Sequence, residues 1–385
     1  MSMDKLAING GPPISERRIA IAKPVFDEKT IQDVEEVIRS GYLRQGPKTK
    51  LFEDNFAERV GAKYAYAVYT GTAALHVSYL SVVKPGDEII VPSFTFFATA
   101  SMAIHSNAVP VFADIDPGTF LIDTEDVKEK ITTKTKAIVP VHLFGNAADM
   151  DALSDISDDH DIKIISDSAQ AHGTEYAGRD LGSYDDLNCY SFYPSKTLTT
   201  GEGGMVTTND KEFDKIGRLL RSHGDNSRYH HVMMGLNYRM SDIMGAIGVN
   251  QLSRLDEFLE TRRHLGNKYL EGVSKISGIT PQKVGSKVNH AYSYFSSVLE
   301  LDELKCTRDE FVEAVNAENI DCAVHYPMPL NVQPAILDIM EPAPCPVSEN
   351  VSARIFSLPM HAELTNADLE TILRGVEKVV SHYQK

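Results

Sequence analysis

The stretch AYAVYTGTAALHVSYLSVVKPGDEIIVPSFTFFATASMAIHSNAVPVFAD, residues 65–114, alternates short apolar runs with segments of helical pattern. Such segments, GTAALHVSYLSVV for example, have roughly the length that a right-handed crossover helix requires. The alternation continues to about residue 207 and therefore predicts an α/β domain with a mainly parallel sheet covered by helices on both faces. Seven runs predict the strands: AYAVY, EIIVP, VPVFAD, AIVPVH, IKIIS, LNCYSF and GMVTT.

The pattern changes after about residue 265. A single long helix is predicted over MSDIMGAIGVNQLSRLDEFLETRRHLG, where it would bridge the sheet domain to the C-terminal part of the chain. Behind it come AYSYFSSVLEL, the helical pattern TRDEFVEAVNAENI, a proline-rich segment interpreted as a long functional loop, and a last helix, NADLETILRGVEKVVSHY. We therefore expect a large α/β domain over residues 1–260, with residues 1–20 as an N-terminal extension, and a smaller α+β domain over residues 261–385.

Charge and composition exclude several classes of partner. The 385 residues carry a formal net charge of −16, so non-specific attraction to nucleic acid or an anionic membrane is not expected. The four cysteines form no CxxC pair, and the histidines form no HExxH pattern, so we expect a reducing compartment and no metal site. No stretch approaches the ~20 apolar residues of a membrane helix, and the N-terminus lacks an apolar leader pattern, which favours a soluble cytoplasmic protein.

Two residues with chemical potential follow predicted strands. Lys196 comes after LNCYSF and the Pro194 turn, and Asp167 ends the run IKIIS. Taken alone, such a lysine is usually a solvated charge and such an aspartate is often a helix N-cap. Ligands of open α/β sheets, however, bind at the carboxyl ends of the strands. Together the two residues suit pyridoxal 5′-phosphate (PLP), because the lysine can form a Schiff base while the aspartate keeps the pyridine nitrogen protonated.

Neighbouring segments could complete such a site. In YTGTAALH, Gly71 and Thr72 begin a predicted helix whose backbone N–H groups would suit a phosphate, although Gly-Thr is also a common N-cap. Ser191 and the turn GEGG either complete this cradle or are simple packing and turn residues. Phe96 is our choice for an aromatic stacked on the ring, with a buried hydrophobic role at least as probable. GEGG lacks both nucleotide-loop frames, so neither a P-loop nor a dinucleotide fingerprint is predicted.

These residues and the segments around them are similar to the DegT/DnrJ/EryC1/StrS family, and the resemblance runs from about residue 20 to about residue 380. The family comprises PLP-dependent sugar aminotransferases of fold type I, which implies a large domain with a seven-stranded, mainly parallel sheet and a smaller α+β C-terminal domain. Nine segments carry the resemblance in sequence order: SGYLRQGPKTKLFEDNFA, GTAAL, PSFTFFATA, PVFADIDPGTF, DSAQAHGTEYAGRDLGS, SFYPSKTLTTGEGGMVTTND, GLNYRMSDIMGAIGVNQL, HYPMPL and SLPMH.

The resemblance assigns roles around the cofactor. It implies that Lys196 is the Schiff-base lysine, that Asp167 is the partner of the pyridine nitrogen, and that Gln170 neighbours the ring hydroxyl. The remaining cofactor contacts that it implies are Gly71, Thr72 and Ser191 at the phosphate and Phe96 as the stacking aromatic.

It also implies an obligate homodimer with shared active sites. Asn237 in GLNYRM matches an asparagine that reaches the cofactor phosphate of the neighbouring subunit, and Arg239 is placed near the substrate's phosphates. His325 and Tyr326 of HYPMPL are further expected substrate contacts. The chain departs from the family pattern at Ser166, often Glu, at Phe96, often Trp or Tyr, and at Asn331, where His is common. These departures leave the cofactor chemistry intact and bear on the sugar pocket.

The implied reaction transfers the amino group of L-glutamate, by way of pyridoxamine 5′-phosphate (PMP), to a nucleotide-linked keto-deoxysugar and leaves 2-oxoglutarate. The product would be an aminosugar for surface polysaccharide or glycoconjugate biosynthesis. SFYPSKTLTTGEGGM favours a 4-keto sugar, as in perosamine-synthase-like enzymes, while the nucleotide (UDP, dTDP or GDP) stays open. A nucleotide-sugar 3-dehydratase of the same family would have histidine in place of Lys196. A non-catalytic regulatory or sugar-nucleotide-binding protein would not need both Lys196 and Asp167.

Overall fold

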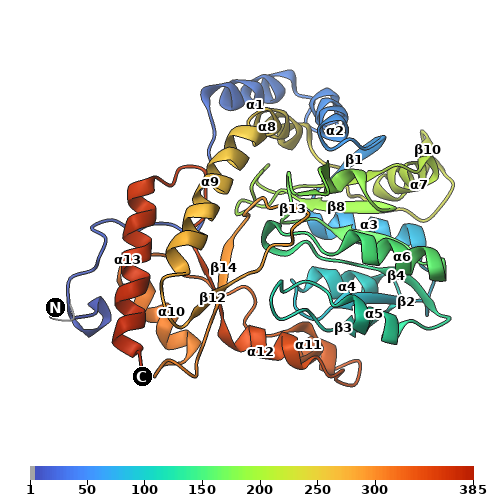
Figure 1. The fold of residues 1–385 in the computed structure, drawn as a ribbon. Helices are drawn as coiled ribbons and strands as arrows, with labels where there is room; N and C mark the ends of the chain where they lie inside the picture. Colours follow the sequence, from blue (N-terminus) through green and yellow to red (C-terminus); the bar gives the residue numbers. More distant parts are fainter. Residues whose placement is uncertain (1–4) are drawn as a thin grey trace.

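The computed structural model describes residues 5–385 and is built around a seven-stranded sheet (Figure 1). The strand order is β1-β9-β8-β5-β4-β2-β3; β9 is antiparallel to both of its neighbours, and the other pairs are parallel. The mainly parallel seven-stranded sheet expected from the apolar runs is confirmed. Its strands are β1 (Tyr64–Val68), β2 (Glu88–Pro92), β3 (Val109–Ala113), β4 (Thr135–Ile138), β5 (Lys163–Asp167), β8 (Leu187–Ser191) and β9 (Gly204–Thr208).

Strand β2 shows why apolar residues occupy successive positions in these runs. Ile89 and Val91 belong to the hydrophobic cluster under one set of helices, whereas Ile90 between them belongs to a cluster on the other face. Successive strand side chains point to opposite faces, so a strand covered on both sides needs apolar residues throughout. One face carries α3 (Gly71–Val82), α4 (Ala98–His105) and α7 (Lys211–Arg221); the other carries α2 (Pro47–Val60), α5 (Thr124–Lys130), α6 (Met150–His160) and α8 (Asp242–Ser253).

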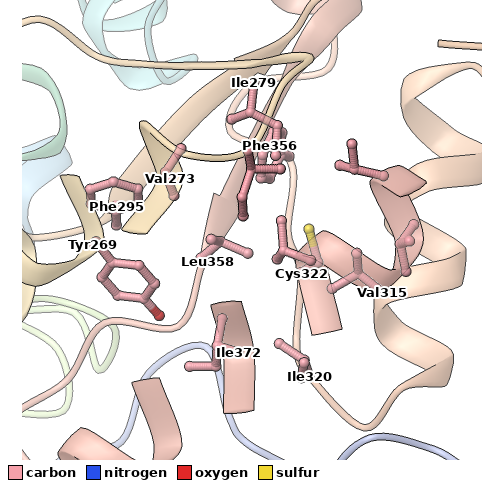
Figure 2. Close-up of a cluster of buried hydrophobic side chains, with 14 of the residues drawn as sticks. Tyr269, Val273, Ile279, Phe295, Val315, Ile320, Cys322, Phe356, Leu358 and Ile372 are labelled. Carbon is pink, nitrogen blue, oxygen red and sulfur yellow. The ribbon is translucent and has the colours of Figure 1, made fainter. Parts of the chain in front are cut away.

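A second hydrophobic core forms around a three-stranded antiparallel sheet, shown in Figure 2. Within it, the rings of Tyr269 and Phe295 stack with centroids 4.5 Å apart. Leu6 and Ile19, from the expected N-terminal extension, are buried in this same core. Helix α12 (Pro346–Arg354) packs in a separate hydrophobic cluster. The elements around the second core are β12 (Ile279–Pro281), β14 (Phe295–Leu299), β15 (Ile355–Leu358), α10 (Arg308–Ala317) and α13 (Asn366–Tyr383). The last of these helices has the bounds that the sequence predicts.

The expected single helix over residues 240–266 is wrong, because the chain forms two helices there. Helix α8 ends at Ser253, Arg254 leaves the helical region with φ −105° and ψ 2°, and α9 (Leu255–Val273) then runs toward the second core. Figure 1 shows α9 descending from the sheet toward α13. Residue 260, the expected domain boundary, falls inside α9, and the division into two domains stays a proposal.

Shorter elements complete the described chain. The proline-rich segment holds a 3-10 turn (Leu330–Val332) and α11 (Pro334–Leu337) within otherwise irregular backbone. Helix α1 (Glu28–Ser40) packs on α8. Two small ribbons pair β6 (Glu175–Tyr176) with β7 (Arg179–Asp180) and β13 (Val288–Asn289), and β10 (Asp225–Ser227) with β11 (His230–His231). Between residues 5 and 385, no helix is long and apolar enough to cross a membrane.

Candidate active site

A cavity of about 540 Å³ opens at the carboxyl ends of the sheet strands. It is lined by the segments that follow β1, β2, β4, β5 and β8, by Tyr294 just before β14, and by His325 and Tyr326 in the segment between α10 and α11. Nine of the predicted site residues line it: Gly71, Thr72, Phe96, Asp167, Gln170, Ser191, Lys196, His325 and Tyr326. Residues far apart in the sequence are therefore brought together, as parallel strands ending at one edge require.

Lys196 lies in the turn that follows β8. Its backbone N–H donates to the Tyr193 carbonyl at 2.9 Å, which closes the turn containing Pro194. Loss of water around the amine lowers the pKa of Lys196 to about 8, although the negative charge of Asp167 opposes the shift. Because desolvation disfavours the charged form, this amine is neutral over much more of the physiological pH range than an exposed lysine.

Asp167 ends β5 as a buried carboxylate with directed hydrogen bonds. Thr99 Oγ1 donates to Oδ2 at 2.9 Å, and the Ala169 N–H donates to Oδ1 at 3.1 Å. Burial raises the pKa of Asp167, and these two hydrogen bonds and the charge of Lys196 act against that rise. Such a fixed carboxylate gains most from a cationic partner placed in the cavity, since opposite charge favours the ionised form.

The N-terminus of α3 meets the end of β8 at very close range. Thr70 caps the helix by accepting from the Ala73 N–H at 3.0 Å, and Gly71 is the first helical residue. A Cβ atom at Gly71 would lie 2.5 Å from Ser191 Cβ, so this approach requires glycine. Backbone N–H groups at a helix start attract anions, and together with Ser191 they form a cradle that suits a phosphate group.

Another part of the cavity wall consists of polar and aromatic side chains from both halves of the chain. Gln170 accepts from the Phe144 N–H at 2.7 Å and donates to the Tyr326 hydroxyl at 3.1 Å. The Phe96 ring is 57% exposed, and its centroid lies 6.2 Å from that of Tyr326. Burial lowers the pKa of His325 to about 4, so its imidazole is neutral near pH 7.

Asn237 and Arg239 do not line this cavity. Asn237 is exposed and pairs by its backbone with Ser222, and Arg239 pairs by its backbone with Val68. The contacts expected of Asn237 and Arg239 are not seen in a single chain, and the one expected of Asn237 is with the cofactor of a neighbouring subunit. Both stay predictions.

The sequence analysis did not identify three residues that shape the site, namely Thr99, Ser195 and Tyr294. Thr99 holds Asp167, and the Tyr294 hydroxyl donates to Ser195 Oγ at 2.7 Å, next to Lys196. Thr99 lies within an ordinary helical pattern and carries no signal of its own. The alternation in AYSYF does place Tyr294 on one face of a strand, but nothing local to it indicates the cavity.

The cavity thus holds a desolvated amine, a buried carboxylate and an anion cradle around one space. These three groups fit PLP: the amine suits its aldehyde, the carboxylate its ring nitrogen, and the cradle its phosphate. A model of the DegT/DnrJ/EryC1/StrS aminotransferase family matches residues 24–377. The chain belongs to this family. Its members are PLP-dependent, which confirms the expected cofactor and fold, and the chain is a PLP-dependent sugar aminotransferase.

Relatives within the DegT/DnrJ/EryC1/StrS family act on different sugars. The chain is 36% identical to UDP-2-acetamido-2-deoxy-3-oxo-D-glucuronate aminotransferase of Pseudomonas aeruginosa, covering 90% of this chain and 94% of that protein. It is 34% identical to GDP-perosamine synthase of Caulobacter vibrioides, covering 94% and 98%. Among solved structures, Spr1654 of Streptococcus pneumoniae in its PMP form is 29% identical, with a TM-score of 0.90, over 95% of this chain and 98% of that chain.

Proposed function

We propose that this family member transfers the amino group of L-glutamate to the carbonyl carbon of a nucleotide-linked 4-ketosugar, leaving 2-oxoglutarate and an aminosugar. The observation that carries the proposal is the juxtaposition of Lys196 and Asp167 in one cavity beside the α3 cradle. The names of the relatives support a nucleotide-sugar substrate. Overall identity does not separate a 3-keto from a 4-keto sugar, because relatives of both kinds are about equally similar. The 4-keto preference therefore rests on the segment SFYPSKTLTTGEGGM.

In this proposal each side chain has a defined task. PLP, when bound, supplies the electron sink that acidifies the donor's Cα–H bond. Lys196 would bind the cofactor aldehyde until the amino group of the donor takes its place. Its freed neutral amine would then accept the proton from the donor's Cα and, in the second half of the reaction, deliver a proton to the former carbonyl carbon of the ketosugar. Asp167 keeps the pyridine nitrogen protonated, Gln170 orients the ring hydroxyl, and the α3 start with Ser191 holds the phosphate. His325 and Tyr326 are the expected substrate contacts.

A second part of the proposal is a homodimer with shared active sites. Asn237 is exposed and lies outside the cavity of its own chain, which is the position expected of a residue that serves a neighbouring subunit. A two-fold dimer is also the commonest symmetric assembly. Arg239, two residues further on, would then reach the substrate's phosphates.

A substrate panel tests this function. Enzyme loaded with PLP is incubated with L-glutamate and UDP-, dTDP- and GDP-linked 3- and 4-ketosugars, and products are identified by mass spectrometry and NMR. We expect an amine at C4 of one 4-ketosugar and an equal amount of 2-oxoglutarate. Lys196→Ala and Lys196→Arg should show no turnover. Amination at C3 alone would overturn the choice of sugar, and full turnover by Lys196→Ala would overturn the mechanism.

A further inference from the structure

Three side chains form a directed chain of hydrogen bonds next to Asp167. The Ala148 N–H donates to His142 Nδ1 at 3.2 Å, so Nε2 carries the imidazole proton and donates to Ser166 Oγ at 3.0 Å. The Ser166 hydroxyl is then left to donate to Asp185 Oδ2. His142 and Ser166 are 0% exposed. Every donor along the chain therefore has one acceptor, which fixes both the tautomer and the direction.

These hydrogen bonds fix the position of residues 140–144, and that segment in turn binds Asp167 and Gln170, two proposed cofactor residues. Residues 140–144 bind both backbone polar groups of Asp167. Its N–H donates to the Pro140 carbonyl at 2.9 Å, and its carbonyl accepts from the His142 N–H at 3.0 Å. The Phe144 N–H of the same segment donates to Gln170. Val141 and Leu143 line the cavity, whereas His142 does not and instead bonds to Ser166.

The carboxylate at the end of this chain comes from an unusual position. Asp185 precedes β8 and has φ +60°, in the left-handed region that non-glycine residues adopt rarely. Its neighbour Asp186 is bound elsewhere, to Lys163 and to the Ile164 N–H. Ser166 carries no charge of its own. A strained backbone that brings in a carboxylate from another segment suggests that the charge serves a purpose.

We propose that His142, Ser166 and Asp185 form a positioning relay that fixes residues 140–144 and, through them, Asp167 and Gln170 at the cofactor ring. The relay rests on the proposed roles of Asp167 and Gln170. An ionised Asp185 accepts a stronger hydrogen bond from Ser166 than a neutral one does.

If Asp185 only had to accept a hydrogen bond from Ser166, a neutral amide side chain could do so. Desolvating an amide costs less free energy than desolvating a carboxylate. Desolvation raises the pKa of Asp185 to about 7, with the nearby charge of Asp186 adding to it and the Ser166 hydroxyl opposing it. The phenol of Tyr190 on β8 also lies close to Asp185, and burial keeps it neutral by raising its pKa. Burial lowers the pKa of His142 to about 3, so its imidazole stays neutral between pH 6 and pH 8. The hydrogen bond from Ser166 to Asp185 is therefore stronger above pH 7, where Asp185 is mostly ionised, than below it.

PLP affinity of the apo-enzyme tests the relay without any sugar substrate. Dissociation constants are measured at pH 6 and pH 8 for wild type, Asp185→Asn, Ser166→Ala and the matched control Asp186→Asn, with melting temperatures for each. Asp185→Asn mimics the protonated acid at every pH. We expect it to bind PLP like wild type at pH 6 and roughly tenfold more weakly at pH 8, with little change in melting temperature. Ser166→Ala should weaken binding at pH 8 as well. Asp186→Asn removes a charge that raises the pKa of Asp185, so it should match wild type at pH 8, where Asp185 is mostly ionised in both.

The relay would be overturned if the ratio of the PLP dissociation constants of wild type and Asp185→Asn were the same at pH 6 and pH 8. A loss of affinity that follows the melting temperature in all variants would overturn it as well. Asp167→Asn separates this outcome from failure of the proposed function. If Asp167→Asn loses PLP while Asp185→Asn and Ser166→Ala do not, the relay alone is wrong; if Asp167→Asn binds PLP normally, the proposed role of Asp167 is wrong.

Discussion

At the scale of single residues, burial acts in opposite directions on the two groups that define the site. It lowers the pKa of the Lys196 amine and raises that of the Asp167 carboxyl, so both are moved toward neutrality. A lysine that must take up and release a proton benefits from this shift. The carboxylate must instead be ionised, and the hydrogen bonds from Thr99 and the Ala169 N–H favour that form.

The lowered pKa of Lys196 predicts when the apo-enzyme captures PLP. The amine is neutral above about pH 8 rather than above its ordinary value of 10.5, so the rate of covalent capture should rise as the pH passes 8 and level off soon after. Stopped-flow visible absorbance from pH 6.5 to 10.5 measures this rate. Lys196→Ala should show no covalent phase. A rate that still rises steeply at pH 10 would mean that Lys196 is an ordinary solvated lysine.

Thr99→Val removes the hydroxyl that donates to Asp167 while keeping the shape of the side chain. The pKa of Asp167 should rise further, because a hydrogen bond that favours its ionised form is lost. A hydrogen bond to a charged group contributes about 1.5–3 kcal/mol, so we expect PLP affinity to fall by roughly tenfold or more. Equilibrium titration of the apo-enzyme measures the change. Thr99→Ser keeps the hydroxyl and should bind nearly as well; equal weakening in both variants would contradict the prediction.

At the scale of elements, the site depends on how closely α3 approaches β8. Gly71→Ala would place a methyl group 2.5 Å from Ser191 Cβ, and the two elements would have to move apart. Overpacking of this kind costs typically 1–3 kcal/mol, and the cradle would open where the phosphate is expected. Denaturant unfolding should show the loss of stability, and phosphate or PLP titration the loss of affinity. Gly285→Ala, whose added Cβ would meet no atom closer than 3.3 Å, is the matched control.

The sequence predicts these elements well where a local pattern decides them. The seven strands are apolar runs bounded by turns. Thr365 is the N-cap of α13, and the capping box that it forms with Asp368 can be recognised in the sequence. The break at Arg254 could not be predicted, because helical spacing continues across residues 240–266 and no proline or glycine marks the break. It follows from packing: α8 lies on α1 and α2, while α9 turns toward the second core.

The same limit applies to the site. Lys196 and Asp167 were predictable because each directly follows a predicted strand. Tyr294 and Thr99 were not, since their roles depend on which strand ends and loops become neighbours in space. Strand order, which places β5 next to β8 and the end of β2 close by, is a property of the whole sheet. The Asp185 side chain likewise reaches Ser166 only once β5 and β8 are paired.

At the scale of the whole molecule, the cavity joins the two hydrophobic cores. Lys196, Asp167 and Gly71 belong to the sheet, whereas Tyr294, His325 and Tyr326 come from the chain around the second core. At the cavity, hydrogen bonds from Tyr294 to Ser195 and from Gln170 to Tyr326 connect the two parts. Residues of both parts therefore have to be in place before the cavity has its full set of groups.

The shared active site predicts that two defective variants can complement each other. Lys196→Ala lacks the amine, and Asn237→Ala lacks the group proposed to cross to the neighbouring subunit. After the two are unfolded together and refolded, half of the dimers should be hybrids, and each hybrid has one site with both residues intact. Activity should then approach about a quarter of that of wild type if Asn237→Ala alone is inactive. If Asn237 instead served its own chain, no intact site would form, and the mixture would show only the mean of its two parents.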